Sequence, residues 1–155
     1  MKMQDSRIIA APRDSVFEAI LKPEMLKICI PGAEEVTGSA AQGFEALVVQ
    51  KVGPVKAKFR GTVKVEDVVP GTALRLVGEG KGGAAGFARG AATVTLADHP
   101  EGTELTYEVD AKIGGKLAQL GSRIIDGFAR KMADQFFERF KKALEIETTF
   151  DGSTG

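Results

Sequence analysis

Few residues in this 155-residue chain carry the chemistry of a catalytic nucleophile or an acid–base group. The chain contains one His, His99, and one Cys, Cys29. A Ser–His or Cys–His pair would require His99, which lies beside Pro100 in a sequence typical of a turn. Cys29 follows an apolar helical segment and is expected to be a small buried hydrophobe. The sequence contains no His-Glu-x-x-His motif and no paired Cys spacing, so we predict no metal site.

A glycine-rich run from Gly78 to Gly86 raises the question of a phosphate-binding loop. The run lacks the Gly-Lys-Ser/Thr ending of a P-loop, and it does not lie between a strand and a helix. Acidic residues such as Glu79 and Glu108 fall on strand positions that are expected to face water. Tyr107 is the one titratable side chain that strand alternation turns inward, so an enzyme hypothesis would have to rest on it.

The longest helical pattern runs from Gly114 to Leu144. At about 1.5 Å per residue such a helix would be roughly 40 Å long, enough to cross a small sheet. Its first apolar stripe, at 100° per residue, consists of Leu117, Gly121, Ile124, Ile125, Phe128 and Met132. The stripe drifts in the second half, which leaves Phe137 outside it. We therefore predict one long amphipathic helix that covers an apolar surface.

Alternating apolar and polar residues predict a β-sheet before this helix. A first strand is expected over Lys2–Ala10, followed by two short helices that end at Pro31-Gly32. The strands expected after them cover residues 44–52, 55–65, 74–80, 92–96 and 105–113. Short turns between them favour antiparallel pairing. The predicted fold is α+β, with a curved antiparallel sheet of about six to seven strands wrapped around the long C-terminal α-helix.

Length and composition favour one domain, which we place at residues 1–147, with a disordered tail at 148–155. Lys plus Arg is 21 and Asp plus Glu is 21, so the balance gives no case for nucleic-acid binding. One Cys fits a reducing compartment. No signal peptide and no apolar run near the ~20 residues of a membrane span is visible. A cytoplasmic location is expected.

Small residues occupy inward positions where the sheet and the helix are expected to meet. The two layers either approach closely there or stay apart and leave a cavity, and residue types alone leave both open. Glycines that would make room are Gly78, Gly80 and Gly121. The side chains expected around such a cavity are Phe59, Phe87, Tyr107, Leu117, Leu120, Ile124 and Phe128. Apolar walls with few polar groups are typical of small-molecule sites.

Several motifs occur together in one known family. They are Cys29-Ile30-Pro31-Gly32, the segment Lys51–Lys56, the run Gly78–Gly86 and the segment Gly114–Arg123. Together they resemble the carbon monoxide dehydrogenase G-subunit family over residues 1 to about 145. That family belongs to the START-like, SRPBCC helix-grip superfamily, whose members enclose a hydrophobic cavity between a curved sheet and a long C-terminal helix. The resemblance therefore favours a cavity.

The resemblance also implies a role. Such proteins are encoded with molybdenum hydroxylases of the carbon monoxide dehydrogenase type. They are associated with membrane recruitment of that enzyme and with passing its electrons on, by binding a quinone. We expect a non-catalytic accessory protein with no covalently bound cofactor. Its expected partners are a lipophilic small molecule, the hydroxylase subunits and, as a further candidate, the inner membrane surface. Glu79 or Arg123 is a candidate for orienting a polar head.

Two other functions stay open at this point. A ligand-free assembly or docking factor would bind the hydroxylase through its cationic strand, which carries Lys56, Lys58 and Arg60. An enzyme of the cyclase or hydrolase branch of the superfamily would depend on Tyr107.

Overall fold

The computed structural model describes residues 1–154, with side chains described for residues 1–145. The chain order is β1 (Lys2–Ile9), α1 (Arg13–Ile20), α2 (Pro23–Cys29), β2 (Ala33–Ser39), β3 (Gly43–Val52), β4 (Val55–Val69), β5 (Ala73–Lys81), η1 (Gly83–Ala85), β6 (Phe87–His99), β7 (Gly102–Gly114), η2 (Gly115–Leu120) and α3 (Ser122–Thr154). The labels η1 and η2 denote short 3-10 helices. Among these helices, none combines the length and the hydropathy of a membrane span.

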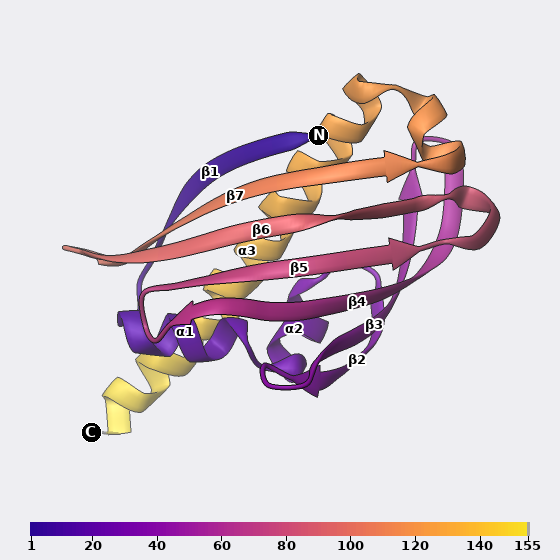
Figure 1. Cartoon of the computed structure of the whole chain (residues 1–155). Coiled ribbons are helices and arrows are strands. Elements are labelled where there is room, and N and C mark those ends of the chain that lie inside the picture. Colours follow the sequence, from indigo (N-terminus) through magenta and orange to yellow (C-terminus); the bar gives the residue numbers. More distant parts are fainter. Residues whose placement is uncertain (155) are drawn as a thin grey trace.

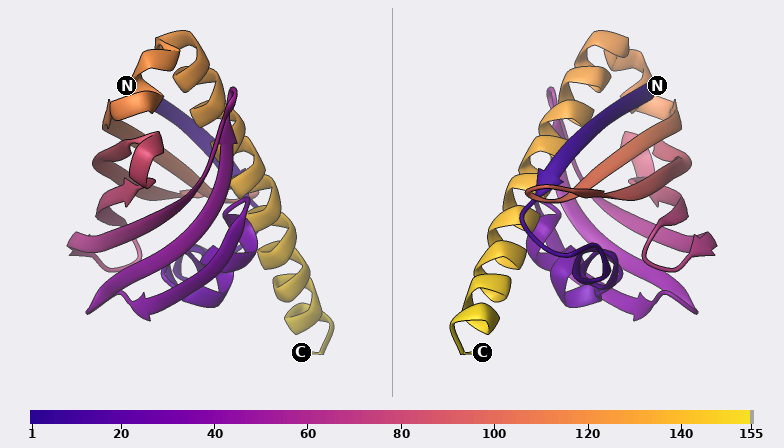
Figure 2. Two further views of the ribbon diagram at one scale, coloured as in Figure 1. Left: turned by 90° about the vertical axis from the view of Figure 1, so that its right-hand side faces the viewer. Right: turned by 90° about the vertical axis from the view of Figure 1, so that its left-hand side faces the viewer.

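The seven strands form one antiparallel sheet in the order β1-β7-β6-β5-β4-β3-β2. The chain crosses from one sheet edge to the other through α1 and α2, and then returns strand by strand (Figure 1). The sheet bends into a trough, and α3 lies along its open side (Figure 2). The predicted α+β helix-grip fold is confirmed. The strand β2 was missed because its sequence, Ala33-Glu34-Glu35-Val36-Thr37-Gly38-Ser39, lacks a clear alternation of apolar residues.

The apolar core fills one end of the trough, where α1, α2 and α3 meet the sheet. Its fully buried members include Ile9, Val16, Cys29, Leu74, Leu105 and Phe140. Phe137, which the helical pattern left outside the apolar stripe, is also buried and stacks on Tyr107 with ring centroids 5.2 Å apart. The pattern failed for Phe137 because a curved sheet contacts α3 on more than one side.

The predicted continuous helix from Gly114 is wrong at its start. Residues Gly115–Leu120 form the 3-10 helix η2, and α3 begins only at Ser122. Gly121 separates them with a φ of 89°, a conformation that residues with a side chain rarely adopt. The helical pattern counted from Leu117 is therefore interrupted at Gly121.

A polar contact ties α3 to the edge strand β1. Arg7 donates hydrogen bonds to Asp134 at 2.6 Å and to the Tyr107 hydroxyl at 3.3 Å. Its guanidinium also lies 5.3 Å from the centre of the Phe137 ring. Burial alone would lower the pKa of Arg7, but the hydrogen bonds and charges of Asp134 and Tyr107 outweigh it and raise this pKa.

The predicted domain at residues 1–147 and the tail at 148–155 stay predictions. The side chains of residues 146–154 and all of Gly155 lie outside the described part of the chain.

Replacing Asp134 by Ala should lower the free energy of unfolding by about 1 kcal/mol, because the half-buried Arg7 loses a charged hydrogen-bond acceptor that is itself solvent-exposed. Urea unfolding followed by circular dichroism measures the change. Asp126→Ala serves as the control, since Asp126 is exposed on the same helix and forms no ion pair within residues 1–145. Equal stabilities for the two variants would contradict a stabilising role for the Arg7–Asp134 contact.

Candidate ligand-binding site

A cavity of about 280 Å³ lies between the concave face of the sheet and α3. Strands β3 to β7, η2, Met1 just before β1 and the first half of α3 all contribute to its wall. The lining residues are Met1, Val48, Gln50, Val52, Phe59, Gly80, Ala88, Ala111, Ile113, Leu117, Ile125, Phe128, Ala129 and Met132. Sheet and helix thus stay apart at this place.

The sheet side of the cavity is left open because direct cross-strand partners on several adjacent strands are small. One row of cross-strand partners runs Ala46, Gly61, Gly80 and Ala88. A Cβ at Gly80 would meet no atom within 4 Å, which means that this position opens into free space. Side chains on α3 cannot reach the floor, and the space stays unfilled.

A second row of small residues, Gly78, Gly90 and Ala111, lies beside the first. A Cβ at Gly90 would collide with the carbonyl oxygen of Asp110 on β7. The close approach of β6 and β7 at this point requires glycine. Gly90 therefore allows β6 and β7 to approach closely beside the cavity.

The wall exposes no polar atoms to the cavity. Gln50 is the one polar side chain in it, and its amide nitrogen donates to the carbonyl oxygen of Pro31. A polar group of a ligand would find no partner inside and would carry an unmet desolvation cost. The cavity is therefore suited to hydrocarbon.

The structure brings four of the predicted site residues together at the cavity: Phe59, Gly80, Leu117 and Phe128. The ring of Phe59 lies against Gly82, where a Cβ would overlap it. Gly78 has its Cβ position directed at Val63 on β4, within 3.4 Å, and does not line the space.

Phe87 and Tyr107 lie elsewhere. Phe87 pairs with Gly114, while its neighbour Ala88 lines the cavity, so alternation places Phe87 on the convex face. There its ring covers Gly114, and the guanidinium carbon of Arg89 lies 5.8 Å from the centre of the ring. Tyr107 belongs to the core with Phe137, away from the cavity.

Leu120, Gly121 and Ile124 also lie outside the cavity, because η2 and the break at Gly121 change the direction of the chain. Gly121 is exposed, so it makes no room for a ligand. The side chains of Leu120 and Ile124 lie over Gly53 in the β3–β4 turn, where a Cβ would be 3.9 and 3.5 Å from them. Ile124 is 42% exposed.

Several lining residues were missed although the sequence carried a signal for them. Ile125 and Met132 belong to the predicted apolar stripe of the helix. Ala111 and Ile113 fall on the inward positions of their predicted strand. The signal for Val48 was weaker, because apolar residues in β3 occupy both faces.

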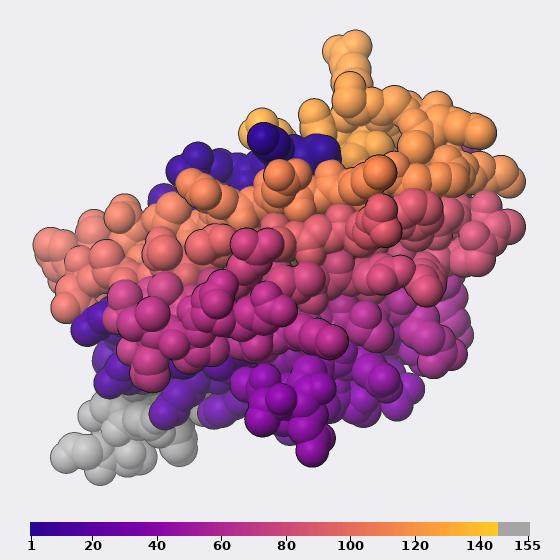
Figure 3. Space-filling view, viewed as in Figure 1, coloured from indigo at the N-terminus to yellow at the C-terminus, as the bar shows by residue number. Residues whose placement is uncertain are grey.

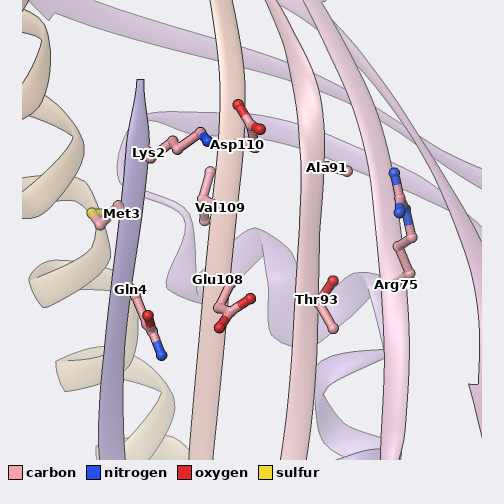
Figure 4. A pocket seen from close by; sticks show the side chains of 9 residues that line it. All are labelled: Lys2, Met3, Gln4, Arg75, Ala91, Thr93, Glu108, Val109 and Asp110. Atoms are coloured by element: carbon pink, nitrogen blue, oxygen red, sulfur yellow. The ribbon is translucent and has the colours of Figure 1, made fainter.

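A second hollow, of about 500 Å³, lies on the convex face of the sheet (Figure 4). Its lining includes Lys2, Arg75, Glu108 and Asp110, which all point away from the cavity. In the space-filling view the strands form a continuous outer wall (Figure 3). This shallow polar surface does not suit an apolar ligand.

The two residues with nucleophile or base chemistry are placed as expected from the sequence. His99 is the last residue of β6, next to the β6–β7 turn, and its Nδ1 accepts a hydrogen bond from the backbone N–H of Glu101 at 3.1 Å. Cys29 is fully buried in the core. Desolvation by burial raises the pKa of the Cys29 thiol to about 11, although the charge of Arg139 acts in the opposite direction.

Iodoacetamide should therefore leave Cys29 unmodified in the native protein at pH 8, because the thiol is both inaccessible and protonated. Addition of guanidinium chloride should make the same thiol react fully, which mass spectrometry detects. Rapid alkylation of the folded protein would show that Cys29 is an accessible thiol.

Comparison with known proteins agrees with this architecture. Residues 6–145 match the family model of the carbon monoxide dehydrogenase G-subunit, CoxG. A conserved protein from Geobacillus kaustophilus is 26% identical, with a TM-score of 0.87 over 94% of this chain and 96% of that chain.

Two more distant structures share the fold alone. A Chromobacterium violaceum protein is 19% identical, with a TM-score of 0.69 over 93% of this chain and 97% of that chain. A Thermus thermophilus protein is 14% identical, with a TM-score of 0.69 over 95% and 99%. No curated protein matches the chain. On the family match over residues 6–145, this chain belongs to the CoxG family, the G-subunit family of carbon monoxide dehydrogenase.

Proposed function

We propose that this protein is a non-catalytic accessory protein of a carbon monoxide dehydrogenase-type molybdenum hydroxylase, and that it carries a lipophilic ligand such as a quinone. Membership of the CoxG family supports the accessory role, because the family is described as a subunit of carbon monoxide dehydrogenase. The apolar cavity between the sheet and α3 is the observation that carries the ligand-binding part of the proposal.

The cavity has the properties of a site for part of a lipophilic molecule. Its volume of about 280 Å³ lies just below the roughly 300–1,000 Å³ range of small-molecule sites. A ring or a short stretch of chain fits this space, and a longer isoprenoid tail would extend beyond it. Atoms that line an unfilled apolar space lack van der Waals contacts on one side, and a hydrocarbon ligand would supply these contacts.

The wall also predicts how a quinone would bind. Quinone oxygens accept hydrogen bonds, and the wall exposes no polar atom to the cavity that could donate one. The hydrocarbon part would therefore occupy the cavity, while the oxygens remain where water or a backbone N–H can reach them. This orientation keeps the redox-active oxygens accessible to a partner.

The non-catalytic role is supported by the position of the reactive side chains. Tyr107, the basis of the enzyme hypothesis, hydrogen bonds to Arg7 and stacks on Phe137 in the core. Cys29 is buried in the same core, and His99 is the last residue of β6, beside the β6–β7 turn. None of these three side chains lines the cavity.

Replacing Gly80 by Leu should weaken binding of the soluble quinone ubiquinone-1 at least about tenfold, because the new side chain projects into the cavity floor. Calorimetric titration of the wild type and the variant measures the affinity. Gly127→Leu is the matched control, since Gly127 is exposed on α3 and a Cβ there meets no atom within 4 Å.

Unchanged binding by a folded Gly80→Leu variant would show that the ligand binds outside this cavity. A wild-type protein that binds no quinone, and that yields no lipophile on organic extraction, would contradict the carrier role.

A further inference from the structure

A further hollow lies beside the apolar cavity and differs from it in chemistry. It has a volume of about 290 Å³ and lies between the edge strand β1, β7 and α3. The charged and hydroxyl-bearing members of its wall are Asp5, Arg7, Tyr107, Arg130 and Asp134. We call it the polar hollow. Since the wall of the apolar cavity exposes no polar atom, the two spaces are chemically complementary.

The polar hollow and the apolar cavity are neighbours along the line where β1 faces α3. Met1 lines the cavity, and Met3, two residues further along the same strand, lines the polar hollow. On α3, Ala129 lines the cavity and the next residue, Arg130, lines the polar hollow. Figure 4 shows Met3 directed toward α3, while Lys2 points the other way. One molecule can therefore place its apolar part in the cavity and its polar part in the hollow.

The polar hollow contains hydrogen-bond donors that the fold leaves unused. The Tyr107 hydroxyl accepts a hydrogen bond from Arg7 at 3.3 Å, and its own proton has no acceptor among residues 1–145. Tyr107 is only 5% exposed, and buried hydroxyls usually find such a partner. The Nε–H group of Arg7 is also buried without an acceptor among the described residues. Arg130 forms no ion pair within residues 1–145.

The charges around the polar hollow balance each other. The guanidinium of Arg7 lies 2.6 Å from a carboxylate oxygen of Asp134 and 3.4 Å from one of Asp5. Arg130 adds the second cation to these two anions. An anionic ligand would meet the two carboxylates, and a cationic ligand would meet the two guanidinium groups. The wall therefore favours an uncharged group whose oxygens accept hydrogen bonds.

We propose that the polar hollow binds the uncharged, carbonyl-bearing head of the lipophilic ligand, whose hydrocarbon part occupies the apolar cavity. The Tyr107 hydroxyl and the Arg130 guanidinium donate hydrogen bonds to a carbonyl oxygen of a quinone ring. This inference rests on the proposed function, because it adds a head site to the cavity proposed there. It assigns Tyr107 to binding and not to acid–base catalysis.

Replacing Tyr107 by Phe, or Arg130 by Gln, should weaken binding of ubiquinone-1 about five- to tenfold, because each change removes one hydrogen-bond donor. Calorimetric titration measures the affinity. The Phe variant keeps the ring that stacks on Phe137, and Arg130 is exposed, so both variants should fold. Thermal unfolding followed by circular dichroism checks this.

Arg123→Gln is the matched control, because Arg123 is exposed on the same helix and lines neither the cavity nor the polar hollow. This control also tests the sequence-based expectation that Arg123 orients a polar head. It should bind ubiquinone-1 like the wild type. Equal losses in Arg123→Gln and Arg130→Gln would overturn the proposal.

Comparisons between probes test the chemical class of the head. Prenylbenzene carries the same prenyl chain as ubiquinone-1 but no ring oxygens, so Tyr107→Phe and Arg130→Gln should not change its binding. An equal loss for prenylbenzene would show that the variants act through the fold, and would overturn the proposal. Decanoate should bind more weakly than 1-decanol, because Asp5 and Asp134 repel a carboxylate. A preference for decanoate would assign the hollow to anionic heads instead.

Infrared spectroscopy reports the proposed hydrogen bonds directly, since a hydrogen bond to a carbonyl oxygen lowers its C=O stretching frequency. Bound ubiquinone-1 should show a carbonyl band at lower frequency than the same quinone in hexane. In the Tyr107→Phe complex this band should move back toward the hexane value. A band in the wild-type complex that matches the hexane value would contradict the head site.

The Gly80→Leu variant separates this inference from the proposed function. Loss of ubiquinone-1 binding in Gly80→Leu, with unchanged binding in Tyr107→Phe and Arg130→Gln, would leave the cavity supported and reject the head site. The reverse result would support the head site and reject the cavity. A wild-type protein that binds no ubiquinone-1 would reject both.

Discussion

The structure depends on a curved sheet whose concave face carries very small residues at its centre. Gly61, Gly80 and Ala88 are direct cross-strand partners, so three neighbouring strands offer little beyond backbone. A helix that crosses such a trough is supported only where large residues rise from the sheet or descend from the helix. Close packing of sheet on helix is therefore impossible at the centre, and the cavity follows from this.

Support for α3 comes from the two ends of the trough. At one end Phe137 and Phe140 pack into the core with Tyr107 and Leu105. At the other end the turn η2 brings Leu117 down into the cavity wall before Gly121 redirects the chain. The first end provides most of the buried apolar contact, and the second provides the enclosure. The contacts that stabilise the fold and the residues that line the cavity thus lie in different parts of one small domain.

The charge distribution follows the same division. The equal totals of Lys plus Arg and Asp plus Glu hide a separation along β4, β6 and β7. These strands carry cations near the cavity end and acids near the core end. Net charge describes solubility and long-range attraction, whereas a surface is recognised by local charge. Three direct cross-strand pairs near the cavity end are cationic, Lys51–Lys56, Arg60–Lys81 and Arg89–Lys112, and such pairs are costly to the fold.

The sequence by itself determined the α+β class, the inward and outward faces of β4, and the amphipathic character of α3, because these depend on local periodicity of two or 3.6 residues. Phe59, Gly80, Leu117 and Phe128 followed from the same patterns. Tertiary structure alone decided the rest. The φ of Gly121 interrupts the helical phase, which moved Leu120 and Ile124 to the β3–β4 turn. Cross-strand register placed Phe87 on the convex face and aligned the cationic pairs. Both effects depend on contacts between residues distant in the chain, which no local pattern contains.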